Sequence, residues 1–469
     1  MISAKATKLD LLNLKSLSTR TFWITSIAFF LCFFAWFGIV PFMPHVVKDL
    51  GLTPDQKWNS IILAVTGTVF ARLLIGKLCD NYGPRLVYTG LLLIGSIPVI
   101  LIGLSQTPLQ FLICRFFIGF IGASFVITQV HTSLMFAPNV VGTANATSAG
   151  WGNLGGGANR LGMPIIASIV VGFGIAETEA WRYSMIIAGI VCLIMAGIYY
   201  RFTQDTPEGN FKDLKAAGKL PKAKKSDFSM SSVLKDYRVW VLFFVYASCF
   251  GVELTVYGTM DDYLQNTFNI NRITAGNIVL SFAMMNIFAR TLGGMFGDKF
   301  GKSKGLRGRV LLLALLLALE GTMLMFFSNI DRLFVAIIFL VAFSLTVQMA
   351  EGATFSVVPF INRKAIGFIS GIVGAGGNVG AFMAAVLLKS KSAVAEKAAI
   401  SSHEGKSADI IDQAQALASS SAVSEGYLII GGIIIISSVA ALAIRFSSQD
   451  EKDVESEMQL ILELSSNKK

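Results

Sequence analysis

Residues 70–83 read FARLLIGKLCDNYG, and residues 288–301 read FARTLGGMFGDKFG. The two stretches align without a gap and share seven identical residues. A second pair, AGWGNLGGG at 149–157 and GAGGNVGA at 374–381, repeats Gly-Asn-x-Gly at one constant spacing. The chain therefore contains two related halves, each carrying the same two markers in the same order.

The composition places these halves in a lipid bilayer. Hydrophobic residues make up 54% of the 469 residues and charged residues only 14%, whereas a soluble protein carries about 25% charged residues. Apolar runs of about 20 residues, long enough to cross a bilayer as helices, recur along the chain. We predict an all-α membrane protein with twelve transmembrane helices in two six-helix halves. The predicted helices cover residues 21–47, 58–79, 86–105, 109–135, 141–175, 181–202, 238–262, 273–297, 309–328, 333–358, 365–388 and 426–446.

The distribution of basic residues predicts the topology. Lysine and arginine collect in short segments that all fall on one side of the twelve helices, which predicts that both termini are cytoplasmic. The linker contains Pro207 and Pro221, and Leu460, Ile461 and Leu464 favour a short amphipathic helix in the tail. The expected order is a cytosolic N-terminus at 1–20, a six-helix bundle at 21–202, a cytosolic linker at 203–237, a second bundle at 238–446 with a long polar outer loop at 389–425, and a cytosolic tail at 447–469.

Several functional classes are excluded by the pattern. The net charge of +10 is explained by topology, so we expect no nucleic-acid partner. The five cysteines lie in or beside apolar runs without metal-ligand spacing, and we find no nucleophile–base set, so we expect no metal, no cofactor and no enzyme. Gly150, Gly152 and Gly155 match a dinucleotide-binding spacing. They lie in an apolar helix rather than after a strand, which makes close helix packing the better interpretation.

Two arginines are predicted at the middle of the membrane. Arg72 and Arg290 lie eight residues before Asp80 and Asp298, or about 12 Å along a helix that starts from the cytoplasmic surface. A cation at that depth costs roughly 2.5 kcal/mol or more unless it faces a cavity and an anion. The paired donors of arginine favour a planar oxyanion. The alternative is a pair of buried salt bridges, with partners from other helices: Glu253, Glu320 or Glu351.

The repeated asparagines are polar groups at the same depth. Asn153 and Asn378 each follow a glycine, Gly152 or Gly377, which lets a helix run close to a ligand or to another helix. The amides therefore either hydrogen-bond the substrate or brace a neighbouring helix.

The two Gly/Asn stretches resemble the signature motifs of the nitrate/nitrite porter family within the major facilitator superfamily. Residues Gly76, Asp80, Gly83 and Arg85, with Asp298 as the counterpart of Asp80 in the second half, are also similar to the general facilitator loop motif, which governs the conformational change. Further segments that are similar to plant, algal and cyanobacterial high-affinity nitrate transporters are FARLLIGKLCDNYGPR, CRFFIGFIGASFV, CFGVEL and EGATFSVVPF.

This resemblance implies a function and a site. It implies a secondary transporter that imports nitrate, and also nitrite, through the plasma membrane by alternating access coupled to protons. By motif, Arg72, Arg290, Asn153 and Tyr246 match residues that bind the anion. Three alternatives stay open: a nitrate/nitrite exchanger, a transporter of another small anion, and a nitrate sensor. The sequence also leaves open an accessory membrane subunit.

Proton coupling requires an acid in the membrane. Glu253 follows Tyr246 by seven residues, so the two lie on nearly the same helix face. Glu351 is the second candidate, and either acid has the alternative role of neutralising an arginine. Gln129 and His131 are candidates for the wall of the cavity.

The chain departs from the family in three places. Arg160 stands where related plant sequences have glutamine, and we predict a third buried cation near the middle of its span. The segment 257–263 (YGTMDDY) and the length of the 389–425 loop also differ from the expected pattern.

Overall fold

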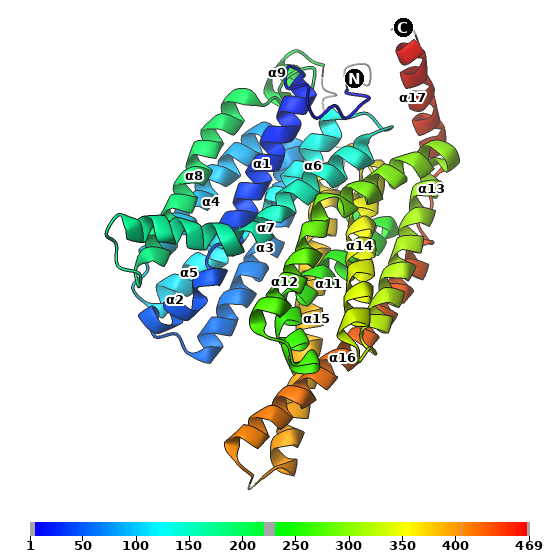
Figure 1. The fold of residues 1–469 in the computed structure, drawn as a ribbon. Coiled ribbons are helices and arrows are strands. Elements are labelled where there is room, and N and C mark those ends of the chain that lie inside the picture. The colour runs from blue at the N-terminus through cyan, green and yellow to red at the C-terminus, as the bar shows by residue number, and fades with distance from the viewer. Residues whose placement is uncertain (1–4, 220–229, 405, 467–469) are drawn as a thin grey trace.

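The computed structural model describes residues 5–219, 230–404 and 406–466. Within these ranges the chain is helical, with two isolated β-bridges and no strand. Figure 1 shows two bundles of long helices side by side, one from each half of the sequence. The predicted all-α membrane fold is confirmed.

The first bundle, drawn from blue to blue-green in Figure 1, contains the helices that precede the linker. At the N-terminus of α3 (Pro54–Tyr82), the side chains and backbone of Thr53 and Gln56 form a capping box. The helices of this bundle are α1 (Leu17–Phe37), η2 (Val40–Phe42), α2 (Met43–Leu50), α3 (Pro54–Tyr82), α4 (Pro84–Gly103), α5 (Pro108–Ile118), η3 (Gly119–Ala123), α6 (Ser124–Met135), α7 (Val141–Gly172) and α8 (Ala180–Phe202).

The second bundle repeats this plan from green to orange-red. Its helices are α11 (Tyr237–Phe268), α12 (Arg272–Met284), η4 (Met285–Ile287), α13 (Ala289–Phe327), α14 (Leu333–Val357), η5 (Val358–Phe360), α15 (Ile366–Ser402) and α16 (Ala408–Ala441).

The number of membrane crossings depends on a kink in α13. Eleven helical segments of the described residues are long and apolar enough to cross a membrane, and the longest runs for 54 residues from Thr274 to Phe327. That segment is interrupted at Lys304 and Gly305, where Gly305 has a φ of 63° in the left-handed region that favours glycine. Because the kink splits it into two crossings, the structure accommodates the twelve predicted helices.

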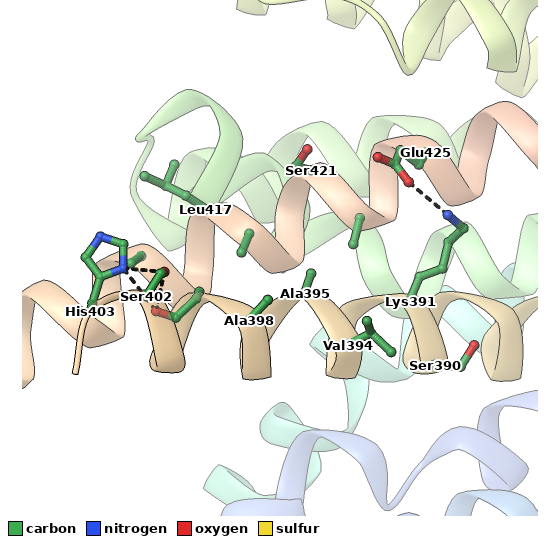
Figure 2. Close-up of a pocket in the computed structure, with 14 residues that line it drawn as sticks. Ser390, Lys391, Val394, Ala395, Ala398, Ser402, His403, Leu417, Ser421 and Glu425 are labelled. Atoms are coloured by element: carbon green, nitrogen blue, oxygen red, sulfur yellow. Dashed lines mark hydrogen bonds and ion pairs between the residues drawn. The ribbon is translucent and has the colours of Figure 1, made fainter.

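The segment expected as a polar outer loop, 389–425, is a helical hairpin instead. α15 continues to Ser402 and α16 begins at Ala408, and the hairpin projects from the bundle at the foot of Figure 1. Alanine, lysine and glutamate are strong helix formers, which explains why a polar segment stays helical outside the apolar span. Figure 2 shows the alanine-lined groove between the two helices, with Lys391 and Glu425 paired at 2.8 Å.

Short helices cover the opposite end of the bundle. The linker forms α9 (Phe211–Ala216) and α10 (Met230–Lys235), while Pro221 lies outside the described residues. The tail forms α17 (Ser448–Ser466), which confirms the expected helix. Glu451 of α17 accepts hydrogen bonds from the backbone of Leu306 and Arg307 at the kink in α13, at 2.9 and 3.3 Å.

At this same end the two halves are joined by reciprocal helix capping. Asp80 at the end of α3 accepts hydrogen bonds from the backbone N–H groups of Gly367 and Phe368, in the first turn of α15. Asp298 on α13 accepts them from Gly142 and Thr143, in the first turn of α7. Carboxylates at helix N-termini satisfy free N–H groups and favour the helix dipole. The duplicated aspartates therefore hold the halves together on one side of the membrane.

Candidate anion site

The two repeated arginines meet at one aromatic ring between the halves. Arg72 comes from α3 and Arg290 from α13, and their side chains are 0% and 1% exposed. The guanidinium carbon of Arg72 lies 5.7 Å from the centre of the Phe250 ring, and that of Arg290 lies 5.9 Å from the same ring. The structure thus brings both predicted cations to one buried place.

Arg72 has no carboxylate partner among the described residues. One of its terminal nitrogens donates to the carbonyl oxygen of Gly374, whereas its Nε and Nη2 atoms are buried without a hydrogen-bond partner. The guanidinium also lies 5.3 Å from the centre of the Phe125 ring, so cation–π attraction offsets part of its desolvation. A buried cation with two free hydrogen-bond donors can bind an anion, whose oxygens accept hydrogen bonds from them.

Arg290, in contrast, is neutralised by two carboxylates. Its Nη2 atom lies 3.2 Å from Glu253 Oε2 and forms a second ion pair with Glu351. Glu253 also accepts hydrogen bonds from Asn286 Nδ2 at 2.6 Å and from Gln348 Nε2 at 3.4 Å. The buried salt bridge considered from the sequence is thus present at Arg290 and, within the described part of the chain, absent at Arg72.

Tyr246 stands beside these cations with a free hydroxyl. The side chain is fully buried, and its hydroxyl oxygen has no hydrogen-bond partner in the part of the chain that the structure describes. Its ring stacks on Phe250 at a centroid distance of 5.2 Å and on Phe125 at 5.8 Å. A buried hydroxyl without a partner costs about 1–3 kcal/mol, so a bound acceptor at this position would stabilise the site.

The two signature asparagines carry unpartnered amide groups as well. Asn378 is fully buried and neither amide atom has a partner within the described ranges, and the Nδ2 atom of Asn153 is in the same state. Next to Asn378, a Cβ added at Gly377 would lie 2.5 Å from Phe250 and 3.0 Å from Tyr246. A Cβ at Gly152 would overlap the ring of Phe29. The glycines therefore let the aromatic walls of the site approach α15 and α7.

The Gly377→Ala variant is expected to lose most of its transport while it still reaches the membrane. The added methyl group displaces the rings of Phe250 and Tyr246, which form the wall beside Arg72. Initial uptake per molecule of purified protein measures the loss. Gly432→Ala is the matched control, because a Cβ at Gly432 meets no atom within 4 Å. Equal uptake by both variants would contradict the placement of this wall.

Two of the candidate cavity residues pack within the first half. His131 contacts the Tyr199 hydroxyl at 2.6 Å and the Gln204 carbonyl at 2.7 Å, which ties α6 to α8 and to the start of the linker. Gln129 donates to the Asn145 carbonyl at 3.3 Å, and its buried Oε1 atom has no partner among the described residues.

Two further predicted residues lie away from the arginine pair. Arg85 of the loop motif donates through Nε to the Tyr200 carbonyl at 2.9 Å, so it joins α4 to α8. Arg160, expected to be a buried cation, has 42% of its side chain exposed and pairs with Asp261 at 3.5 Å. Its neighbour Asn159 is 1% exposed, so the difference comes from the face of α7 on which Arg160 lies and not from its depth along the helix.

Several residues that shape the site have little or no signal in the sequence. Phe125 and Phe250 provide the faces on which the cations rest, and Asn286 and Gln348 donate to Glu253. An aromatic residue in an apolar helix has no distinguishing signal, since the chain contains 36 phenylalanines. Asn286 and Gln348 had a weak signal, because they are amide side chains at membrane depth.

Comparisons with known proteins find membrane transporters that are similar to this chain. The family model described as Major Facilitator Superfamily matches residues 25–385. The chain is 39% identical to the high affinity nitrate transporter 2.5 of Arabidopsis thaliana over 81% of this chain and 75% of that protein. It is 37% identical to nitrate transporter 2.2 of Chlamydomonas reinhardtii, covering 77% of this chain and 71% of that one. It is 29% identical to the nitrate/nitrite transporter NrtP of Nostoc punctiforme, covering 76% and 84%.

Solved structures with low sequence identity share the fold. A bacterial homologue of the human lysosomal transporter Spinster, in an inward-facing and unoccupied conformation, gives a TM-score of 0.62 at 15% identity, covering 92% of this chain and 99% of that one. The proton:xylose symporter XylE gives a TM-score of 0.63 at 13% identity, covering 91% and 95%. At these identities the likeness concerns the helical architecture alone.

Proposed function

The chain belongs to the Major Facilitator Superfamily and, within it, to the nitrate/nitrite porter family, and from this premise we propose that it carries nitrate across a membrane by alternating access. Nitrite, which the name of the cyanobacterial relative includes, is the second proposed substrate. The protein is not an enzyme.

One observation carries the proposal: Arg72 is a buried cation with two free donors and no carboxylate partner among the described residues. Nitrate is planar, monovalent and offers paired oxygens to a guanidinium fork. The Tyr246 hydroxyl and the Asn378 amide, both buried without partners, supply further hydrogen bonds to such an anion. The anion replaces the missing counter-ion of Arg72 and satisfies these donors together.

Alternating access follows from the position of the site between the halves. Arg72 and Arg290 are fully buried, so the site is closed to solvent in this conformation. Opening toward the side of the chain ends requires the release of Asp80 from α15 and of Asp298 from α7. Nitrate that contacts arginines of both halves adds interactions that exist only when the halves are together, which favours the closed form.

Proton coupling follows from the charges around the site. With both carboxylates ionised, Arg72, Arg290, Glu253 and Glu351 sum to zero charge. A nitrate ion adds one negative charge to this dry space, and one proton on a carboxylate restores neutrality. The amides of Asn286 and Gln348 donate to Glu253, which favours its ionised form. Among the described residues, Glu351 has its ion pair with Arg290 and no amide donor, which makes Glu351 the proposed proton carrier.

We also propose that the protein lies in the cell membrane with both chain ends in the cytoplasm. The Lys/Arg-rich segments lie at the end of the bundle that carries α9 and α17, which is the expected cytoplasmic side. Nitrate enters from the opposite side, where the α15–α16 hairpin projects.

Uptake of labelled nitrate into proteoliposomes tests the proposal. We expect an inward proton gradient to drive accumulation of nitrate above its external concentration, because protonation compensates the charge of the anion. The same assay is repeated without the gradient, with nitrite inside the vesicles. Uptake that does not depend on the gradient and requires internal nitrite would mean that the protein is an exchanger and not a symporter. If no nitrate were taken up under either condition, the proposed substrate would be wrong.

A further inference from the structure

Two segments singled out in the sequence, around Arg160 and at 257–263, meet in the structure. Arg160 lies on α7 of the first half, and Asp261 lies on α11 of the second half, within the unusual YGTMDDY segment. The Nη1 atom of Arg160 lies 3.5 Å from the Oδ2 atom of Asp261. A cation of the first half and an anion of the second half thus form a pair.

This pair lies on the outer side of the anion site. Arg160 follows Asn153 by seven residues, which places it about 10 Å farther along α7. Asp261 follows Glu253 by eight residues, about 12 Å farther along α11. Both helices run away from the end that is closed by Asp80 and Asp298. The pair therefore stands between the buried site and the side from which the anion enters.

The outer pair differs in kind from the contacts at the cytoplasmic end. There, Asp298 is buried and accepts three hydrogen bonds from Gly142 and Thr143. The side chains of Arg160 and Asp261 are 42% and 34% exposed and share one ion contact. Exposed ion pairs are weak and screened by salt. The outer connection is thus easily broken, and its rupture leaves a water-accessible arginine at the entrance.

We propose that Arg160 is an outer binding station for the entering monovalent anion, and that Asp261 occupies this station as an internal counter-ion while the outer side is closed. This inference rests on the proposed function. When the halves separate on the outer side, nitrate takes the place of the Asp261 carboxylate on Arg160. The anion then moves inward to the free donors of Arg72.

Nitrate uptake by matched neutral variants tests the station. Arg160→Gln is expected to raise the KM for nitrate about fivefold at about 10 mM salt, where the Debye length is about 30 Å, with kcat unchanged. The difference should vanish at about 1 M salt. Asp261→Asn should not raise KM, because it leaves the cation in place. If both variants changed KM alike, or if neither did, the station would be refuted.

A second measurement needs no nitrate transport and follows the pair directly. In the Gly157→Cys variant a thiol faces Ala283 of the other half, where an added Cβ meets the Ala283 methyl group at 3.7 Å. We expect Asp261→Asn, combined with this variant, to raise the labelling rate of the thiol by a membrane-impermeant maleimide severalfold. The chain without Gly157→Cys gives the background from native cysteines.

The two measurements separate the inference from the proposed function. Wild-type protein that takes up no nitrate would overturn the substrate, whereas the labelling result would still decide whether the pair closes the outer side. An unchanged labelling rate in the Asp261→Asn background would overturn the role of the pair even where nitrate uptake is intact.

Discussion

Replacing Arg72 by lysine is expected to lower nitrate uptake about 100-fold, since the loss of a charge-assisted hydrogen bond of about 2.7 kcal/mol corresponds to that factor. Lysine keeps the positive charge but not the planar fork that gives a bidentate contact. It also cannot reproduce both the contact with the Gly374 carbonyl and the two free donors. Initial rates of labelled nitrate uptake, normalised to folded protein, measure the effect.

The Arg182→Lys variant is the matched control for this prediction. Arg182 is also an arginine of the first half, but it pairs with Asp49 at 2.8 Å and lies far along the chain from the repeated motifs. Lysine keeps the positive charge beside Asp49, and no anion is proposed to bind there, so this variant should change uptake per folded molecule by less than about twofold. If Arg72→Lys retained wild-type uptake, the proposed role of this arginine would be wrong.

The duplication in the sequence predicted the arrangement of the site better than any single motif. Two arginines eight residues before two aspartates had to lie at equal depth in related helices, and the structure places both beside Phe250. The aspartates themselves were predicted only as parts of a loop motif. Their reciprocal capping of α15 and α7 depends on how the halves pack, which the local sequence does not encode.

The sequence did not predict the asymmetry between the two arginines. Half of the residues in the two 14-residue stretches around them are identical, yet Arg290 has two carboxylate partners and Arg72 has none among the described residues. The partners come from α11 and α14, separated from Arg290 by 37 and 61 residues in the chain. Only tertiary packing decides which arginine a distant carboxylate reaches.

The outer side of the protein also has features that the local sequence does not predict correctly. The polar segment 389–425 was predicted as a loop because hydropathy reports burial in lipid, and helices that continue into water have no apolar signal. Arg160 was predicted as a buried cation from its position within an apolar span. Its exposed side chain and its partner Asp261 depend on how the two halves face each other at that end.

The Glu351→Gln variant is expected to lose gradient-driven accumulation of nitrate while it keeps exchange of labelled for unlabelled nitrate. Glutamine resembles the protonated carboxyl group in shape, so Arg290 stays free to bind nitrate in every step, but no proton is carried. We therefore expect accumulation under an inward proton gradient to fall about tenfold or more, and counterflow to stay within about threefold of wild type. Proteoliposomes loaded with unlabelled nitrate separate the two rates.

Two other buried carboxylates provide the controls that make this result specific. Glu320 on α13 is fully buried, and neither of its oxygens has a partner among the described residues, so Glu320→Gln removes a carboxyl group that does not contact Arg290. It should leave gradient-driven accumulation intact. Glu253→Gln should weaken both modes of transport together, because Asn286 and Gln348 then lose the ionised acceptor that orders them beside Arg290. If Glu351→Gln still accumulated nitrate and Glu253→Gln kept only exchange, the proton would travel on Glu253 instead. If neither variant lost accumulation, both carboxylates would be counter-ions of Arg290 and the coupling site would lie elsewhere.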